Sequence, residues 1–404
     1  MSLPGAARKL RVPLMVPSYG DAEVADVVSV LKSGNVTMGE KVKRFEESWA
    51  EYVGTKYALM VNSGSSANLL AHFVIADRAS RHRVLPGDEV ITPAVTWATT
   101  VFPIFNIGAR PVFVDVDVET MNMDPTQLRR ALSKKTRALT IVHLLGNPCE
   151  MDEIGAFAEE HDLPIIEDAC NAHGAEYGGK MCGSFGAMGT FSFYFSHIIS
   201  TIEGGMLVTD SEEHYELAKA LRNFGWIRGL KSERSYTADY PFIDKRFLFA
   251  HVGFNFRPTE VQGAIGTRQL RRLPRYLRIR KANAEYWLEE LSRFERFFIL
   301  PKPNARGNHV WHHFPLTLRP TAPFTRAQLV SFLESMGVET RPISAGNITE
   351  QPALAGLKFR TVGRLVNSRL IMRNSLEWGN HQGIGQKERE YVVDCIGEFV
   401  SRHT

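Results

Sequence analysis

Residues 165–171, Ile165-Ile166-Glu167-Asp168-Ala169-Cys170-Asn171, have the pattern of a short buried strand that ends in an acidic residue. Strands of a parallel sheet are covered on both faces, so they appear as nearly continuous apolar runs. Open α/β sheets bind their ligands outside the carboxyl ends of such strands. The carboxylate of Asp168 is therefore a candidate ligand contact, although an acid that caps the following loop would leave the same pattern.

The strand pattern recurs on both sides of this segment. Runs with helical periodicity lie between the strands, which predicts right-handed βαβ crossovers and one mostly parallel sheet. After about Arg257 long helices dominate. The sequence therefore predicts an α/β fold with a large domain over residues 1–256 and a smaller α+β domain over residues 257–404. The expected strands of the large domain are residues 57–61, 89–92, 111–114, 138–143, 164–168, 190–194 and 206–209.

The composition favours a folded protein that acts on a small anionic molecule. The chain has 404 residues, 44% of them hydrophobic and 23% charged, so it can bury a sizeable core. Its net charge of +4 is spread out, without a dense basic stripe interleaved with aromatics, which argues against nucleic acid. No run of about 18 apolar residues occurs, and the segment from Met1 to Leu14 lacks the apolar core of a signal peptide. We expect a cytoplasmic protein without a membrane span.

The four cysteines give no sign of a metal centre. Cys149, Cys170, Cys182 and Cys395 are spaced so that no two lie within four residues of each other. Compact zinc and iron–sulfur sites are usually built from closely paired cysteines. We therefore expect free thiols and no metal, although distant cysteines can still converge in a fold.

Two segments before the Asp168 strand have the composition of a ligand site. Asn62-Ser63-Gly64-Ser65-Ser66-Ala67-Asn68 follows a strand and opens a helix. Free N–H groups beside hydroxyls at a helix start form a phosphate pocket, but the same residues also fit an ordinary serine cap. Pro93-Ala94-Val95-Thr96-Trp97 places an aromatic ring after a strand, where it can stack on a cofactor or belong to the core.

Two further candidate segments follow the strand that ends at Asp168. Phe191-Ser192-Phe193-Tyr194-Phe195-Ser196-His197 precedes the turn Glu203-Gly204-Gly205, and its histidine is either a proton carrier or a satisfied core residue. Gly253-Phe254-Asn255-Phe256-Arg257 lies where the two domains meet. Its polar groups suit contact with a partner subunit, and they equally suit a hinge loop.

The order of these five segments resembles the DegT/DnrJ/EryC1/StrS family over nearly the whole chain. The resemblance implies a fold-type I, aspartate aminotransferase-like enzyme that depends on pyridoxal 5′-phosphate (PLP) and acts on nucleotide-linked keto-sugars. It implies that Asp168 pairs with the pyridine nitrogen of the cofactor and that Asn171, in place of the more usual glutamine, binds the ring hydroxyl. It also implies that the ring stacks on Trp97 and that the phosphate is bound by Ser65, Ser66, Ser192 and, across a homodimer, Asn255 of the partner subunit.

The chain departs from the common family pattern at His197. Most members have a lysine there, which bonds the cofactor covalently. The branch with histidine consists of nucleotide-sugar 3-dehydratases, and the segment Thr340-Arg341-Pro342-Ile343-Ser344-Ala345-Gly346-Asn347 resembles that branch too. One kind within it carries a cysteine-ligated iron–sulfur cluster after the histidine. No cysteine occurs between Cys182 and Cys395, so the resemblance favours the other kind, typified by GDP-4-keto-6-deoxy-D-mannose 3-dehydratase of the route to colitose.

The expected activity follows from this resemblance. Pyridoxamine phosphate (PMP) would condense with the 4-keto group of a nucleotide-linked 4-keto-6-deoxyhexose, His197 would move the protons, and the C3 hydroxyl would leave. L-Glutamate would regenerate PMP and yield 2-oxoglutarate. Two alternatives are a sugar aminotransferase with an atypical histidine and a non-catalytic regulatory protein that keeps the cofactor pocket. Candidate partners of the substrate pyrophosphate, each of which can also be merely solvated, are Arg222, Arg228, Arg306 and Arg341.

Overall fold

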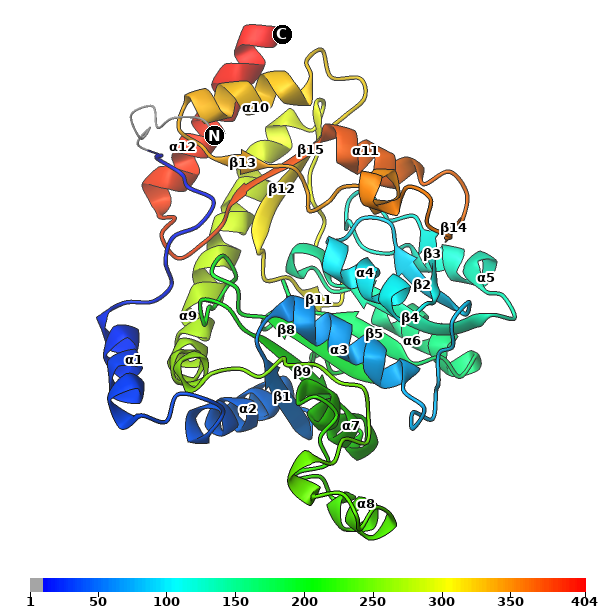
Figure 1. The fold of residues 1–404 in the computed structure, drawn as a ribbon. Coiled ribbons are helices and arrows are strands. Elements are labelled where there is room, and N and C mark those ends of the chain that lie inside the picture. Colours follow the sequence, from blue (N-terminus) through cyan, green and yellow to red (C-terminus); the bar gives the residue numbers. More distant parts are fainter. Residues whose placement is uncertain (1–9) are drawn as a thin grey trace.

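The computed structural model describes residues 10–404. Residues 1–9 lie outside the described part, so the expectation for the segment from Met1 to Leu14 falls largely on residues without a structural description. In the described residues the chain builds a large central sheet with helices on both faces and a smaller antiparallel sheet at the carboxyl-terminal end (Figure 1).

The central sheet is mostly parallel, as the alternation of strands and helices predicts. Only β9 runs antiparallel to its neighbours β1 and β8, and the other pairs are parallel. Within the sheet Asp168 lies between Val142 and Thr190 of the two neighbouring strands. The strands, in spatial order, are β1 (Tyr57–Val61), β9 (Gly205–Thr209), β8 (Met188–Ser192), β5 (Ile165–Asp168), β4 (Thr136–Val142), β2 (Glu89–Pro93), β3 (Arg110–Val114) and β14 (Arg360–Thr361).

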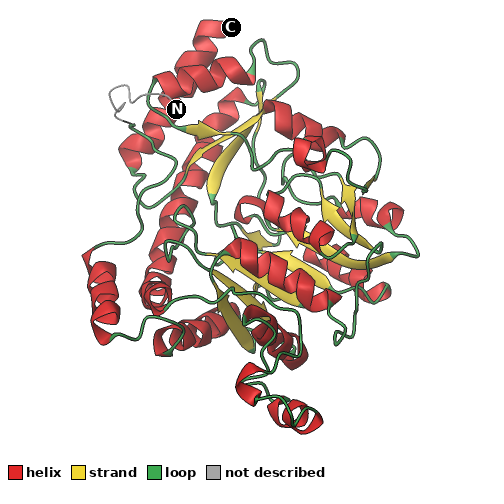
Figure 2. Cartoon of the chain, in the orientation of Figure 1, coloured by secondary structure: helices red, strands yellow, loops and turns green. Residues whose placement is uncertain are grey.

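Helices bury their apolar sides against both faces of this sheet (Figure 2). One face is covered by α3 (Gly64–Ala76), α4 (Ala98–Asn106) and α7 (Glu212–Arg222). The other is covered by α2 (Glu40–Val53), α5 (Leu128–Ala131), α6 (Met151–Glu160) and the first part of α9 (Glu260–Leu291). Outside these layers, α1 (Asp21–Ser33) packs on α9, and α8 (Glu233–Asp239) lies beyond α7 at the lower end of the view in Figure 1.

The smaller unit combines helices with an antiparallel sheet. Its core surrounds the rings of Trp287, Phe314 and Trp378, which pack edge to face or tilted. Helix α9 runs unbroken through Pro274 and joins the two units. Strand β14 belongs to residues 257–404 but pairs with β3 at the edge of the large sheet. The smaller unit therefore contributes one strand to the sheet of the large unit. The sheet has the order β10 (Phe298–Ile299), β12 (His313–Leu318), β15 (Ser375–Gly379) and β13 (Thr340–Arg341), beside α10 (Arg326–Ser335), α11 (Val366–Asn374) and α12 (Gln386–His403).

Three short strands connect the units at a second place. They pair in the order β11 (Gly307–Asn308), β6 (Glu176–Tyr177) and β7 (Lys180–Met181). All four cysteines are free thiols, and three of them are fully buried. Within residues 10–404 no helix is long and apolar enough to cross a membrane, and no group of acidic, histidine and cysteine residues is arranged to hold a metal ion.

Candidate active site

Asp168 lies at the carboxyl end of β5 and is almost completely buried. Its Oδ2 accepts hydrogen bonds from Asn68 Nδ2 at 2.8 Å and Thr100 Oγ1 at 2.7 Å, and its Oδ1 accepts one from the backbone N–H of Cys170 at 3.1 Å. Among the described residues no lysine, arginine or histidine forms an ion pair with this carboxylate. A buried charge normally has a charged partner. The protonated ring nitrogen of a pyridine cofactor fits this requirement.

The start of α3 forms a pocket for a phosphate group. Ser63 caps the helix through a hydrogen bond from the Ser66 backbone N–H to its Oγ at 3.1 Å. Helix geometry leaves the N–H groups of Gly64 and Ser65 without partners inside the helix. They point out of its N-terminal end, where the helix dipole is positive. The hydroxyl of Ser65 is exposed beside them. These donors suit an anion such as a cofactor phosphate.

Close contact brings Ser192 to the same pocket. A Cβ on Gly64 would lie 2.3 Å from the Cβ of Ser192, so only glycine allows the end of β8 to approach the start of α3 this closely. A Cβ on Gly205 would lie 2.2 Å from the Ser63 carbonyl oxygen. The turn before β9 is therefore in close contact with the backbone of Ser63, the residue that caps α3. Ser192 thus lies against Gly64 at the start of α3, next in sequence to Ser65 and Ser66.

Trp97 is the residue immediately before α4, and 58% of its side chain surface is exposed. The neighbouring Val95 forms an isolated bridge with Asn347, and the Ala345 N–H donates to the Thr96 carbonyl at 3.4 Å. The segment 340–347 of the smaller unit therefore lies against the loop that presents Trp97. An exposed indole between the two units is available to cover a bound ring.

His197 follows β8 and is partly buried beside Asn171. The Nδ1 of His197 is 3.5 Å from Nδ2 of Asn171. Loss of hydration lowers the pKa of His197 well below its ordinary value of 6.5, and the positive character of His173, His313 and Arg280 lowers it further. The imidazole is therefore neutral at neutral pH, which is the state that a proton acceptor requires.

A segment of the smaller unit surrounds His197 from the other side. The His312 ring lies 5.1 Å from the His197 ring, centroid to centroid, and the buried Nη1 of Arg280 donates to the His312 carbonyl at 2.7 Å and to the Trp311 carbonyl at 3.3 Å. Burial lowers the pKa of Arg280 to about 9. Arg280 thus fixes the segment that carries His312, and neither residue is among those that the sequence marks as candidates.

Asn255 is exposed on the surface of this chain. Its Oδ1 accepts a hydrogen bond from Arg257 Nε at 2.9 Å. The next residue, Phe256, accepts a backbone hydrogen bond from Asn62 at 3.0 Å, which places this loop beside the residues that precede α3. The amide of Asn255 is therefore accessible to a second subunit, while its backbone is anchored near the phosphate pocket of its own.

The four candidate arginines do not form one cluster. Arg222 is buried and donates through Nη1 to Glu46 Oε1 at 2.8 Å and to the Met60 carbonyl at 2.7 Å. Arg306 pairs with Asp152 and lies over the Tyr177 ring. Arg228 and Arg341 are exposed, and neither forms an ion pair within residues 10–404. Arg222 and Arg306 are thus engaged by the protein, whereas Arg228 and Arg341 have free guanidinium groups.

Replacing Arg222 by methionine is expected to destabilise the fold by about 3 kcal/mol, because removal of one partner leaves Glu46 buried without its cation. Burial already raises the pKa of Glu46. Urea unfolding measures the loss, and Arg228→Met at an exposed position serves as the control, with a change within about 0.5 kcal/mol. Unchanged stability together with a higher KM for the sugar nucleotide would instead indicate that Arg222 binds substrate.

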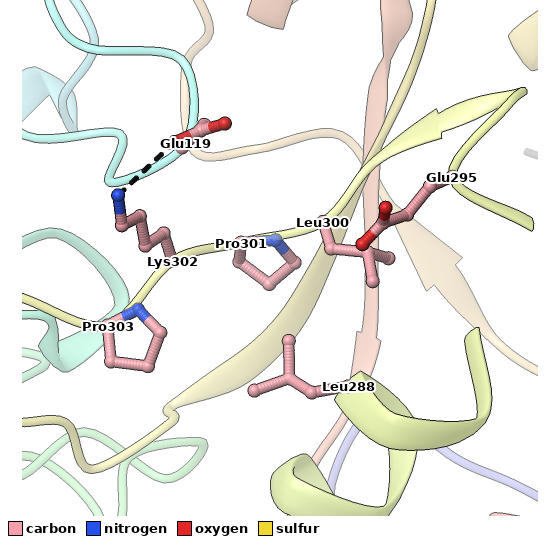
Figure 3. Close-up of a pocket in the computed structure, with 7 residues that line it drawn as sticks. All are labelled: Glu119, Leu288, Glu295, Leu300, Pro301, Lys302 and Pro303. Atoms are coloured by element: carbon pink, nitrogen blue, oxygen red, sulfur yellow. Dashed lines mark ion pairs between the residues drawn. The ribbon is translucent and has the colours of Figure 1, made fainter. Parts of the chain in front are cut away.

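A separate hollow of about 350 Å³ lies between the two units, away from these residues. Figure 3 shows Lys302 extended toward Glu119, with 3.9 Å between Nζ and Oε2. None of the candidate site residues lines it. The lining residues are Glu119, Leu288, Glu295, Leu300, Pro301, Lys302 and Pro303.

Relatives of this chain are similar to it in sequence over most of their length. A model of the DegT/DnrJ/EryC1/StrS aminotransferase family matches residues 17–397. A GDP-4-keto-6-deoxy-D-mannose 3-dehydratase from Escherichia coli O55:H7 is 39% identical over 391 residues, which cover 96% of this chain and 100% of the relative. A dTDP-4-dehydro-2,6-dideoxy-D-glucose 3-dehydratase from Saccharopolyspora spinosa is 37% identical over 393 residues, which cover 95% of this chain and 85% of the relative.

A solved structure shows the same architecture. The crystal structure of a GDP-4-keto-6-deoxymannose-3-dehydratase with a trapped PLP-glutamate geminal diamine matches with a TM-score of 0.89 and 38% identity, and the match covers 95% of this chain and 100% of that one. The expected aminotransferase-like α/β fold is thereby confirmed. Since the family model spans nearly all of the described residues, the chain belongs to the DegT/DnrJ/EryC1/StrS aminotransferase family.

Proposed function

We propose that this chain is a PLP/PMP-dependent 3-dehydratase of a nucleotide-linked 4-keto-6-deoxyhexose, GDP-4-keto-6-deoxy-D-mannose, and that L-glutamate regenerates PMP. The observation that carries the proposal is the place of His197, whose Nδ1 lies 3.5 Å from Nδ2 of Asn171 at the edge of the site that Asp168 and the start of α3 form. The names of the relatives from Escherichia coli and Saccharopolyspora spinosa, both 3-dehydratases, support the reaction. The PLP-glutamate adduct in the solved relative supports the cofactor and the amine donor. The proposal includes a cytoplasmic location and needs no nucleic acid or membrane partner.

The residues of the site have separate tasks in this proposal. When bound, the cofactor supplies an amine that condenses with the sugar ketone and a ring that accepts an electron pair. Asp168 holds the proton of the ring nitrogen, and Asn171 binds the ring hydroxyl. Trp97 covers one face of the ring and excludes water. The cofactor phosphate is held by Ser65, Ser66, Ser192 and the N–H groups at the start of α3.

His197 moves the proton that the reaction requires. Its neutral imidazole takes a proton from the C4′ carbon of the cofactor, and the resulting cation returns that proton to the C3 hydroxyl, which leaves as water. Imidazole carries protons without forming a lasting bond to the cofactor carbonyl. His197 would therefore leave the amine of a bound cofactor available to the sugar. The pyrophosphate of the substrate is assigned to the exposed Arg228 and Arg341, because their guanidinium groups are unpaired within the described residues.

The proposal includes a homodimer in which Asn255 of one subunit contacts the cofactor phosphate of the other. Mixing two inactive variants, His197→Asn and Asn255→Ala, is then expected to restore about one quarter of the wild-type activity. Half of the randomly formed dimers are hybrids, and in each hybrid one of the two sites combines an intact His197 with an intact Asn255. Activity is measured after the subunits have been mixed, unfolded and refolded together.

If Asn255 served only its own subunit, no hybrid would hold a complete site and the mixture would stay inactive. Refolding each variant alone provides the baseline for this comparison. Size-exclusion chromatography with light scattering establishes that hybrids can form. A monomeric active enzyme would contradict the shared site.

The substrate is tested by incubating the pure protein with PLP, L-glutamate and the GDP-, CDP- and dTDP-linked 4-keto-6-deoxyhexoses in turn. The expected result is a 3-deoxy-4-keto product with release of ammonia, with GDP preferred, as seen by mass spectrometry. The dTDP arm is included because the Saccharopolyspora spinosa relative is named for a dTDP sugar. An amino sugar as product would establish an aminotransferase, and no turnover with any sugar would establish a non-catalytic protein.

A further inference from the structure

Two chains of hydrogen bonds converge on a single oxygen of Asp168. In the first chain Thr96 Oγ1 donates to Thr100 Oγ1 at 2.7 Å, and Thr100 Oγ1 donates to Asp168 Oδ2 at 2.7 Å. A hydroxyl that accepts one hydrogen bond becomes a stronger donor, so Thr96 strengthens the bond that Thr100 gives to the carboxylate. Both threonines are fully buried.

The second chain reaches the same oxygen through an amide. Thr190 Oγ1 donates to Asn68 Oδ1 at 2.6 Å, and Asn68 Nδ2 donates to Asp168 Oδ2 at 2.8 Å. Because the amide oxygen accepts from the threonine, the amide nitrogen must face the carboxylate. Asn68 is buried completely, and its own backbone carbonyl contacts the His72 ring at 2.8 Å.

The two oxygens of Asp168 thus have different surroundings. Oδ2 accepts two short hydrogen bonds from side chains, whereas the backbone N–H of Cys170 donates to Oδ1 at the longer distance of 3.1 Å, and the Cys170 thiol also interacts with this carboxylate. A carboxylate oxygen has room for two acceptor directions. Both acceptor directions of Oδ2 are therefore used by the protein, so Oδ1 is the oxygen that can turn toward a bound group.

We propose that Thr100 and Asn68 are positioning residues that commit Oδ2 of Asp168 to the protein and present Oδ1 to the ring nitrogen of the bound cofactor. The donors on Oδ2 hold the side chain so that Oδ1 faces the ring nitrogen, and a carboxylate at that nitrogen favours its protonated form. The protonation of the cofactor ring is then set by residues of α3 and α4 that do not touch it. This inference rests on the cofactor of the proposed function but not on the sugar substrate.

The test uses PLP labelled with ¹⁵N in the ring, bound to the full chain. The wild type is expected to show the ¹⁵N shift of a protonated ring nitrogen across neutral and mildly alkaline pH. Thr100→Val keeps the shape of the side chain and removes the donor. We expect the shift to move toward that of the neutral ring and the Kd for PMP to rise about 10-fold, since a hydrogen bond to a charged group is being removed. Thr100→Ser restores the hydroxyl and is expected to restore both values.

Thr317→Val is the matched control. Thr317 is buried as completely as Thr100, but its hydroxyl contacts Ser375 Oγ at 2.7 Å in the smaller unit and not Asp168. It is expected to leave the ¹⁵N shift and the Kd unchanged. Asn68→Leu provides a second variant on the other chain, in case Thr100→Val does not fold, and is expected to act in the same direction as Thr100→Val.

Several outcomes overturn the inference. A protonated ring nitrogen and wild-type affinity in both Thr100→Val and Asn68→Leu would show that the two donors do not control Oδ1. An equal effect of Thr317→Val would show a general loss of packing instead of a directed hydrogen bond. If the wild type bound no PLP, this inference and the proposed function would fail together. If the ¹⁵N shift responded as expected and no sugar were dehydrated, only the proposed function would fail.

Discussion

Replacing His197 by lysine is expected to abolish 3-dehydration, with a loss of roughly 10²–10⁴-fold, the usual contribution of a positioned acid–base group. The lysine amine would bond the cofactor at the position that His197 occupies beside Asn171. That bond competes with the condensation between cofactor and sugar, and a lysine returns the proton along the route to an amino sugar. Turnover of the 4-keto sugar with L-glutamate, followed by product mass, measures the loss.

Borohydride reduction followed by peptide mapping gives a second measurement. It is expected to attach the cofactor to the new lysine in His197→Lys and to leave the wild type without any lysine-bound cofactor. His197→Asn is the control, because it removes the base without adding an amine. It should lose dehydration and remain unlabelled. Retained dehydration in His197→Lys, or a labelled lysine in the wild type, would contradict the role given to His197.

The architecture around the site could be predicted from the sequence because its signals are local. The apolar run before Asp168 is a strand from Ile165 to Asp168, and the serine-rich segment after β1 begins α3 at Gly64. A proline usually ends or kinks a helix, so the sequence predicts two helices, 259–273 and 278–294, where the structure has the single helix α9 running through Pro274. Strand β14, only two residues long, could not be predicted, because its place beside β3 depends on a contact between the two units.

The proposed cofactor contacts could also be predicted from sequence motifs, whereas the residues that hold those contacts in place could not. Asn68 and Thr100 reach Asp168 across 100 and 68 residues of sequence, so no local pattern connects them. A polar Asn68 inside the apolar run of α3 is the one signal that was present, since a buried amide requires partners.

The sequence was least informative about which arginine side chains are buried and which are exposed. Arg280 lies in a helix rich in arginine and looks exposed by composition, yet it is buried and bound to backbone carbonyls beside His312. Arg222 was grouped with candidate substrate contacts, and the structure places it against Glu46 inside the large unit. A guanidinium group is assigned to an ion pair or to a ligand by its three-dimensional neighbours, which the sequence does not contain.

Replacing Asp168 by asparagine is expected to reduce the rate of dehydration by roughly 10²–10³-fold, the range for removing one preorganised polar partner of a reacting centre. Asparagine keeps the size of the side chain and can still accept from Thr100 through its oxygen. Its amide then carries no charge to hold a proton on the ring nitrogen, so the ring withdraws electrons less strongly when the C4′ proton leaves. The fold should persist, because the substitution removes a buried charge that has no cationic partner among the described residues.

Single-turnover kinetics with PMP-loaded protein measures this loss directly, and ring-labelled ¹⁵N-PLP reports the protonation state independently. Asp168→Asn and Thr100→Val are expected to move the ¹⁵N shift in the same direction, with the larger change in Asp168→Asn, because Thr100 acts only through Asp168. Combining the two substitutions should therefore add little to Asp168→Asn alone, since partners in one network are not additive. Full additivity of the two losses would mean that Thr100 has a separate task, and an Asp168→Asn variant with wild-type kinetics would remove Asp168 from the reaction.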